Sequence, residues 1–184
     1  DPTRIYIFST DTVYGLGTPL SNLAGIKRIF DIKGRDKSKP MAVLVADLAQ
    51  ADALVDWPTP LYRDPLNDVW PGALTVVVPA KKSVPEEVRS GFPTLGLRCP
   101  QHPALQALLR ELGPWVATSV NRSGQPPMDD QAAIRAEFAA EVDDFLFFDP
   151  LPQGQASTVV DLTVVPPKLL RAGPQSIEPF MAMV

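Results

Sequence analysis

The chain has 184 residues, of which 45% are hydrophobic and 21% are charged, and its formal net charge is −4. A chain of this length buries roughly 70% of its unfolded surface, and its ordinary composition excludes a disordered protein. The acidic balance excludes a generally basic coat for nucleic acid, although 17 Lys and Arg residues can still form a local basic cleft. We expect one globular domain over residues 1–184.

The sequence predicts a soluble, cytoplasmic protein that does not contact the membrane. No apolar run reaches the length of about 18 residues that a membrane-spanning helix needs. The single cysteine, Cys99, has no partner for an intrachain disulfide, which fits a reducing compartment.

The first element is a buried strand at residues 5–8, followed by a polar loop at residues 9–17. Hydroxyl groups of Thr10, Thr12 and Tyr14 fall in this loop together with two glycines that let a backbone approach closely. The loop is either a simple polar turn or the floor of a ligand site. We expect Asp11 to cap the loop through backbone N–H groups, with contact to a ligand as the other possibility.

A helix is predicted from a Ser21 cap to about residue 31, and a cationic loop follows it. In this loop, Lys33 and Arg35 are alternate residues, so in an extended backbone they point the same way and can grip one anion. The alternative is a solvated helix end, where cations also suit the helix dipole.

Strands and helices then alternate along the chain, which predicts an α/β fold. We expect strands at residues 41–45, 74–78, 95–98, 145–148 and 168–173, and another that begins at Trp115. Helices are expected at residues 47–55, from Thr59-Pro60, at 84–89, 104–112 and 130–142.

Two residues that often carry chemistry lack partners in this sequence. Cys99 has no neighbouring base and is expected to be a small buried residue, and His102 has no set of further metal ligands around it. We therefore predict neither a nucleophile–base pair nor a metal centre. Arg98, at the end of an apolar strand, needs a carboxylate or phosphate partner, which is either a protein acid or a ligand.

Cations and hydroxyls instead gather where the predicted strands end. Such groups suit the binding of phosphates and a small polar substrate, and neither a P-loop nor a dinucleotide fingerprint is present. The candidate site residues are Thr10, Thr12, Tyr14, Lys33, Arg35, Thr75, Arg98, Ser119, Asn121, Ser157 and Arg171.

Six stretches, in the same order along the chain, resemble the motifs of the YrdC-like (TsaC) family. The resemblance as a whole extends over residues 9–173, and the six stretches together are far more specific than any one of them. The stretches are TDTVYGL at residues 10–16, KGR with KP at 33–40, WPG with Thr75 at 70–75, RCP with HP at 98–103, SVNRSG at 119–124 and STVVD at 157–161.

The resemblance implies a twisted mixed sheet flanked by helices, with a concave face, and a threonylcarbamoyl-AMP synthase activity. Such enzymes join L-threonine, bicarbonate or CO2, and ATP, usually with Mg2+, into threonylcarbamoyl-AMP and pyrophosphate. The product is used by tRNA-modification partner proteins. It also implies contact with tRNA as a possibility.

Roles for the site residues follow from the same resemblance. Lys33 and Arg35 would stabilise the charge that grows during nucleotidyl transfer. Threonine would contact Thr10, Thr12, Tyr14 and Arg98. The nucleotide would contact Lys33, Arg35, Thr75, Ser119, Asn121, Ser157 and Arg171.

Two alternatives remain at this point. The chain could be a non-catalytic module that binds double-stranded RNA or tRNA, which its net charge of −4 disfavours. It could also be a carbamoyl-transfer domain related to those of hydrogenase-maturation proteins, although the cysteine pairs of the zinc fingers in those proteins are missing.

Overall fold

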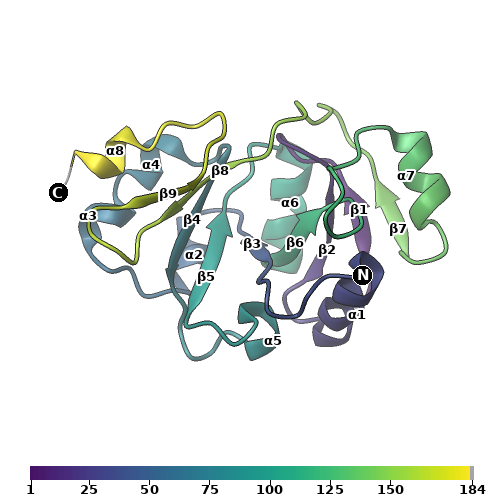
Figure 1. Cartoon of the computed structure of the whole chain (residues 1–184), viewed down its shortest axis with the longest axis horizontal. Coiled ribbons are helices and arrows are strands. Elements are labelled where there is room, and N and C mark those ends of the chain that lie inside the picture. Colours follow the sequence, from purple (N-terminus) through teal and green to yellow (C-terminus); the bar gives the residue numbers. More distant parts are fainter. Residues whose placement is uncertain (183–184) are drawn as a thin grey trace.

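A computed structural model describes residues 1–182, and in this part of the chain nine strands form one sheet that eight helices flank (Figure 1). The strands are β1 (Tyr6–Phe8), β2 (Gly15–Pro19), β3 (Ala42–Leu44), β4 (Leu74–Pro79), β5 (Thr94–Arg98), β6 (Trp115–Ser119), β7 (Asp144–Leu146), β8 (Thr158–Asp161) and β9 (Lys168–Arg171). The helices are α1 (Leu23–Lys33), α2 (Leu48–Asp52), α3 (Pro60–Arg63), α4 (Leu66–Val69), α5 (Glu86–Arg89), α6 (Pro103–Leu112), α7 (Gln131–Phe138) and α8 (Glu178–Met181).

The sheet is mixed, with the strand order β7-β1-β2-β6-β3-β5-β4-β8-β9. The pairs β1–β7, β3–β5 and β4–β8 are parallel, and the other pairs are antiparallel. Figure 1 shows β8, β9 and α8 at one end of the molecule and β1, β7 and α7 at the other. The prediction of a single α/β domain with a mixed sheet is confirmed over the described residues, and residues 183 and 184 of the expected domain lie outside them.

The two faces of the sheet differ because side chains alternate along each strand. One face carries bulky apolar side chains that are fully buried in the main core. Examples from adjacent strands are Val43, Val76, Leu97 and Val116. Helices α1, α2, α4, α5 and α7 contribute to this same core.

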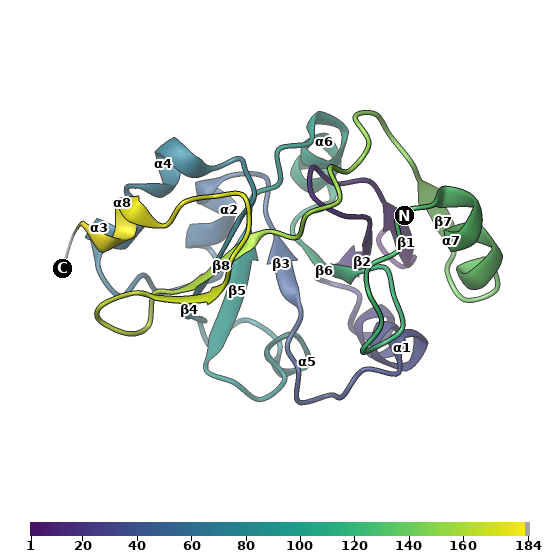
Figure 2. The same cartoon turned by 45° about the horizontal axis from the view of Figure 1, so that its top comes forward.

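The opposite face is only partly covered. A second apolar cluster joins Leu105 and Leu109 of α6 to Trp115, Tyr6 and Phe8 of the sheet. In Figure 2, α6 lies on one side of the central strands and α1 and α5 lie on the other. The remainder of the α6 face is open, and this is where the cleft described below forms.

The loop at residues 9–17 is shorter than the sequence predicts, because Gly15, Leu16 and Gly17 belong to β2. Glycine normally weakens a strand. Here a Cβ atom on Gly15 would lie 2.6 Å from Cε2 of Phe8, and one on Gly17 would lie 2.4 Å from the carbonyl oxygen of Val116. Close packing between strands therefore requires both glycines.

The first helix also differs from its prediction. The side chain of Asn22, not Ser21, caps α1 by accepting a hydrogen bond from the amide of Gly25. The helix continues to Lys33 and ends at Gly34, whose φ of 59° is left-handed. Lys33 is thus part of the last helical turn and does not lie in an extended loop.

Other boundaries shift by a few residues. Helix α7 ends at Phe138, four residues before the predicted end at 142, and the strand expected at 145–148 is β7, at Asp144–Leu146. The short helices α4 and α8 were not predicted, since four residues give too little apolar periodicity to detect. Over residues 1–182, no helix is long and apolar enough to cross a membrane.

Candidate functional site

A cleft of about 350 Å³ lies on the open face of the sheet. This volume falls within the range of about 300–1,000 Å³ that is usual for small-molecule sites. Part of its floor is made by residues with small or no side chains on the neighbouring strands β2, β3, β5 and β6, namely Gly15, Ala42, Gly96 and Ala117. Ala42 and Ala117 lie directly opposite each other in the register of β3 and β6. The floor is therefore deep because its side chains are small.

The lining of the cleft is positively charged. Three arginines, Arg35, Arg98 and Arg171, line it, and no carboxylate does so among the described residues. Arg98 lies opposite Thr75, Thr75 opposite Val159, and Val159 opposite Arg171, so that one row of the sheet has an arginine at each end. Such a concave, cationic surface attracts anionic ligands.

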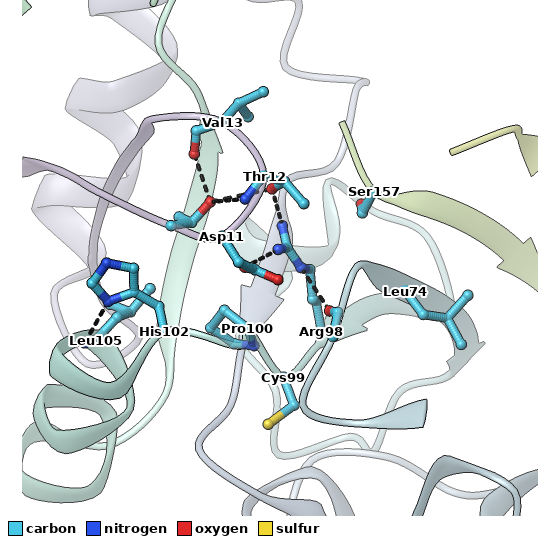
Figure 3. Close-up of polar contacts among 12 residues, drawn as sticks. Asp11, Thr12, Val13, Leu74, Arg98, Cys99, Pro100, His102, Leu105 and Ser157 are labelled. Carbon is cyan, nitrogen blue, oxygen red and sulfur yellow. Dashed lines mark hydrogen bonds and ion pairs between the residues drawn. The ribbon is translucent and has the colours of Figure 1, made fainter. Parts of the chain in front are cut away.

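Arg98 is buried and bonded to three segments of the chain (Figure 3). Its Nε donates to the carbonyl of Gly72 at 3.3 Å, its Nη1 donates to Oγ1 of Thr12 at 2.6 Å, and its Nη2 forms an ion pair with Asp11. Burial lowers the pKa of Arg98, and the Asp11 carboxylate acts in the opposite direction. The expected capping role of Asp11 is wrong, because its carboxylate binds Arg98 from another strand; sequence spacing does not reveal such a distant partner.

The hydroxyls of the β1–β2 loop are connected to one another. Thr10 Oγ1 donates to the carbonyl of Val13 at 2.6 Å and accepts from the amide of Thr12 at 3.1 Å. The two hydroxyl oxygens are 3.2 Å apart, and since the Thr10 proton goes to Val13, the Thr12 hydroxyl is the donor between them. Both threonines line the cleft. These bonds use both lone pairs of Thr10 Oγ1, whereas Thr12 Oγ1, which accepts from Arg98 Nη1, keeps one lone pair.

Tyr14 lines the same cleft, but its ring belongs to the core. The ring meets Phe147 edge to face at 5.3 Å, and the hydroxyl accepts a hydrogen bond from Nε2 of Gln131 at 2.9 Å. The residue that orients the phenol, Gln131, comes from α7 and was not predicted, since nothing in the sequence links it to Tyr14.

Lys33 lies behind the wall of the cleft. Its side chain is 2% exposed, and its ammonium donates to the carbonyl of Ser119 at 2.6 Å and to Oδ1 of Asn121 at 2.8 Å. Burial, with the nearby Arg35, lowers the pKa of Lys33 to about 8. Ser119 Oγ also donates to Asn121 Oδ1, at 2.6 Å. Of these three residues, only Ser119 lines the cleft.

Arg35 lines the cleft from the loop after α1, separately from Lys33. Its Nε donates to the carbonyl of Lys39 at 3.0 Å, and its Nη2 donates to the carbonyl of Pro40 at 2.9 Å. The prediction that Lys33 and Arg35 project together from an extended loop is therefore wrong, because Gly34 ends the helix between them.

Thr75, Ser157 and Arg171 form a third group of the predicted residues. The hydroxyls of Thr75 and Ser157 are 2.8 Å apart, and Arg171 donates from Nη2 to the Ser157 hydroxyl at 3.1 Å and from Nε to the Ser157 carbonyl at 2.9 Å. All three line the cleft. Within residues 1–182, neither Arg171 nor Arg35 has a carboxylate within 4.0 Å, in contrast to Arg98.

Nine of the eleven predicted site residues thus line one cleft, while Lys33 and Asn121 support its wall. The small floor residues were missed in the sequence. For Gly96 a signal exists in the alternation of small or polar residues with leucine along β5, Thr94-Leu95-Gly96-Leu97-Arg98.

Cys99 and His102 serve the fold beside the cleft. The thiol of Cys99 is buried, donates to the carbonyl of Ala46 at 3.3 Å and has its pKa raised to about 11 by burial, which confirms the interpretation as a small buried residue. Nδ1 of His102 accepts from the amide of Leu105 at 3.4 Å and caps α6. In the described part of the chain, no group of three His, Cys, Asp or Glu side chains is placed to hold a metal ion.

A family model, Sua5_yciO_yrdC, described as telomere recombination, matches residues 3–173. The chain belongs to this family. A relative from Mycobacterium tuberculosis H37Rv is 35% identical over 175 residues, which are 95% of this chain and 81% of the relative. The threonylcarbamoyl-AMP synthase of Bacillus subtilis is 32% identical over 183 residues, which cover 98% of this chain and 53% of that protein.

Solved structures of the family share the fold. Pyrococcus abyssi Sua5, crystallised with L-threonine, superposes with a TM-score of 0.86 at 33% identity, over 93% of this chain and 51% of that one. Escherichia coli YciO superposes with a TM-score of 0.85 at 26% identity, over 97% of this chain and 87% of that one. This chain thus spans about half the length of Sua5 and most of YciO.

Proposed function

We propose that this chain is an L-threonylcarbamoyl-AMP synthase, which converts L-threonine, bicarbonate or CO2, and ATP into threonylcarbamoyl-AMP and pyrophosphate. The observation that carries the proposal is the cleft lined by three arginines and no carboxylate, in a family whose B. subtilis and P. abyssi members bear this name. Sua5 of P. abyssi, which shares the fold, has been crystallised with L-threonine. The RNA-binding alternative is not favoured, since these relatives are named as synthases.

The proposed reaction has two bond-forming steps. The threonine amine adds to CO2, which forms an N–C bond and, after loss of a proton, gives a carbamate. A carbamate oxygen then attacks the α-phosphorus of ATP in line, and the bond from that phosphorus to the pyrophosphate oxygen breaks. Both steps balance without a covalent bond to the enzyme, and the second makes the protein a nucleotidyltransferase.

Negative charge on the phosphoryl group and the leaving pyrophosphate would be stabilised by fixed cations. Arg35 and Arg171 suit this role, because their protein partners are neutral oxygens and their charges are not cancelled locally. Lys33 would act through the wall, by holding Ser119 and Asn121 and by adding positive charge behind them. Nucleotide contacts are proposed for Thr75, Ser119, Asn121 and Ser157 as well.

Threonine would lie at one end of the cleft, where the β1–β2 loop forms the wall. Thr12 presents one hydroxyl lone pair there, which suits the ammonium or amine of an amino acid, and Thr10, which also lines the cleft, orients the Thr12 hydroxyl. Tyr14 shapes the wall, and Arg98 is proposed to bind the carboxylate with the N–H groups that the protein leaves free.

Mg2+ is proposed as part of the ATP substrate. Magnesium at nucleotide sites is typically held by one or two carboxylates together with phosphate oxygens. The lining of this cleft offers hydroxyls but, among the described residues, no carboxylate. The ion would therefore be held by the phosphates and water. Transfer of the product to tRNA-modification partner proteins, contact with tRNA and a cytoplasmic location are parts of the same proposal.

The decisive experiment measures pyrophosphate release with ATP, L-threonine and bicarbonate, each left out in turn. We expect release only when all are present. Calorimetry should show that L-threonine binds in preference to L-serine and L-valine. A protein that binds no threonine would not be this synthase.

Matched variants test the assigned residues in the same assay. Arg35→Ala should reduce release strongly, whereas Lys37→Ala should not, because Lys37 is exposed in the same loop and does not line the cleft. Full activity of both Lys33→Ala and Arg35→Ala would contradict the roles given to these cations.

A further inference from the structure

We propose that Asp11 is a positioning residue: it holds Arg98 so that the N–H groups of Arg98 not used by the protein face the carboxylate of the amino-acid substrate. The inference rests on the proposed function, in which Arg98 binds that carboxylate. Asp11 itself is not among the residues that line the cleft, whereas Arg98 is. Asp11 therefore acts from behind the residue that meets the ligand.

The pair is well enclosed. The side chains of Arg98 and Asp11 are 8% and 13% exposed, and they come from β5 and from the β1–β2 loop, far apart in the sequence. At such a place, an arginine without a counter-charge would be strongly unfavourable. The negative charge of Asp11 is therefore needed to stabilise the charged guanidinium of Arg98 in the wall of the cleft.

Three of the five N–H groups of Arg98 are occupied by the protein. Gly72, Thr12 and Asp11 each accept one of them, on Nε, Nη1 and Nη2 respectively. An arginine has five such donors, so two remain. With three anchors from three chain segments, the guanidinium cannot rotate freely, and the two remaining donors are held in fixed directions.

Asp11 also allows two arginines to face one cleft. Arg98 and Arg171 stand in the same row of the sheet, and Arg171 together with burial lowers the pKa of Arg98, while Asp11 raises it. Arg171 has hydroxyl and carbonyl partners only. The counter-charge is thus supplied to the buried arginine and not to the exposed one, so the row keeps a net positive charge.

The backbone around Asp11 is itself fixed. The amide of Gln153 donates to the carbonyl of Asp11 at 3.4 Å, and the amide of Gly154 donates to the carbonyl of Thr12 at 2.8 Å. A carboxylate that enters the cleft thereby meets donors that are already oriented, and little side-chain entropy is lost on binding.

The test compares Asp11→Ala and Asp11→Asn with wild type, using KM for threonine and for ATP in the pyrophosphate assay. For Asp11→Ala we expect KM for threonine to rise about tenfold, with KM for ATP within about twofold, because only the carboxylate contact is disturbed. Asp11→Asn should raise KM for threonine by about threefold, since its amide oxygen can still accept from Arg98. If Asp11→Ala does not fold, Asp11→Asn carries the test.

A comparison of L-threonine with L-threoninol tests the contact with the carboxylate directly. Asp11→Ala should weaken calorimetric binding of L-threonine and leave that of L-threoninol, which lacks the carboxylate, unchanged. The matched control is Asp52→Ala, which removes the ion pair with Arg63, bonded at 2.9 and 2.7 Å, and neither of these residues lines the cleft. This control should change neither KM.

Three results would overturn the role of Asp11: equal rises in both KM values, an unchanged KM for threonine, or a lower one in Asp11→Ala. The last would mean that Asp11 competes with the ligand for Arg98. A wild-type protein that binds no threonine would overturn the proposed function along with this inference. If the wild type is active and Asp11→Ala has the same KM for threonine as the wild type, this inference alone is overturned.

Discussion

Two neighbouring residues of β5, Gly96 and Leu97, show how differently the two faces of the sheet are built. Leu97 is fully buried in the main core. Gly96 lines the cleft, and a Cβ atom on it would meet only Cγ2 of Thr75 at 3.6 Å and Cα of Ala42 at 3.9 Å, which are ordinary contacts. One face is filled to stabilise the fold, and the other is kept open.

The difference teaches that packing does not explain every glycine of the sheet. Gly15 and Gly17 are required by Phe8 and by the backbone at Val116. Glycine within a strand weakens it by roughly 0.5–1 kcal/mol relative to alanine, and Gly96 has no steric reason to accept that cost. A glycine in such a place is typical of a surface that a ligand or another backbone approaches closely.

The largest expected effect concerns the packed face. Leu97→Ala should lower the free energy of unfolding by about 2–5 kcal/mol, because it leaves a cavity in the core. Urea unfolding followed by circular dichroism measures this. Any protein that remains folded should keep its KM for ATP, and a loss below about 1 kcal/mol would show that the face is less tightly packed than described.

On the open face, replacing an arginine should lower the rate of pyrophosphate release strongly and change the free energy of unfolding little. Arg171→Ala should lower kcat/KM for pyrophosphate release by about 10²–10³-fold, by analogy with loss of one transition-state donor. Its free energy of unfolding should change by less than about 1 kcal/mol, since the residue is exposed. Lys168→Ala is the control, because Lys168 is exposed on the same strand and does not line the cleft. Equal effects of the two variants would contradict the assignment.

A single methyl group separates the open floor of the cleft from the closely packed part of the sheet more finely. Gly96→Ala should weaken ligand binding about tenfold, which corresponds to about 1.4 kcal/mol, and should leave the midpoint of thermal unfolding unchanged or higher. Gly17→Ala, which lies outside the cleft lining, should do the reverse, lowering stability by about 1–3 kcal/mol through its clash with the carbonyl oxygen of Val116. Calorimetry and thermal melts of both variants decide the point. Wild-type affinity for ATP and for threonine in Gly96→Ala would mean that no ligand approaches this part of the floor.

The last expected effect is a dependence of stability on pH. Lys33 has a pKa of about 8 in the folded protein, below its usual value near 10.5, so between these pH values the unfolded chain binds more protons than the folded one. The free energy of unfolding should therefore gain a positive slope with pH from about 8 to 10.5. Lys33→Met should lack this contribution in urea titrations at each pH. The same slope in wild type and variant would show that other groups cause it.

The sequence predicts most of the secondary structure, because strands such as residues 74–78 are rich in apolar and β-branched residues, and α6 begins at Pro103 and is followed by Gly113. The sequence does not predict β2, because Gly15 and Gly17 are typical of a turn. Only the tertiary structure shows that the Phe8 ring and the Val116 carbonyl lie against them and leave no room for a side chain. The sequence also predicts Lys33 in a loop, since Lys33 is the first of four cations in seven residues, and this run continues past the end of α1 at Gly34.

For the site, the residue types were determined by the sequence alone: cations and hydroxyls at strand ends, without a metal set or a nucleophile pair. Tertiary structure decided how each of them is used. It paired Arg98 with Asp11 across 87 positions, left Arg35 and Arg171 with neutral partners, and buried Lys33 behind the wall. The physical reason is that charge and hydrogen-bonding capacity belong to a residue, whereas pairing, burial and free donors depend on which distant segments the sheet brings together.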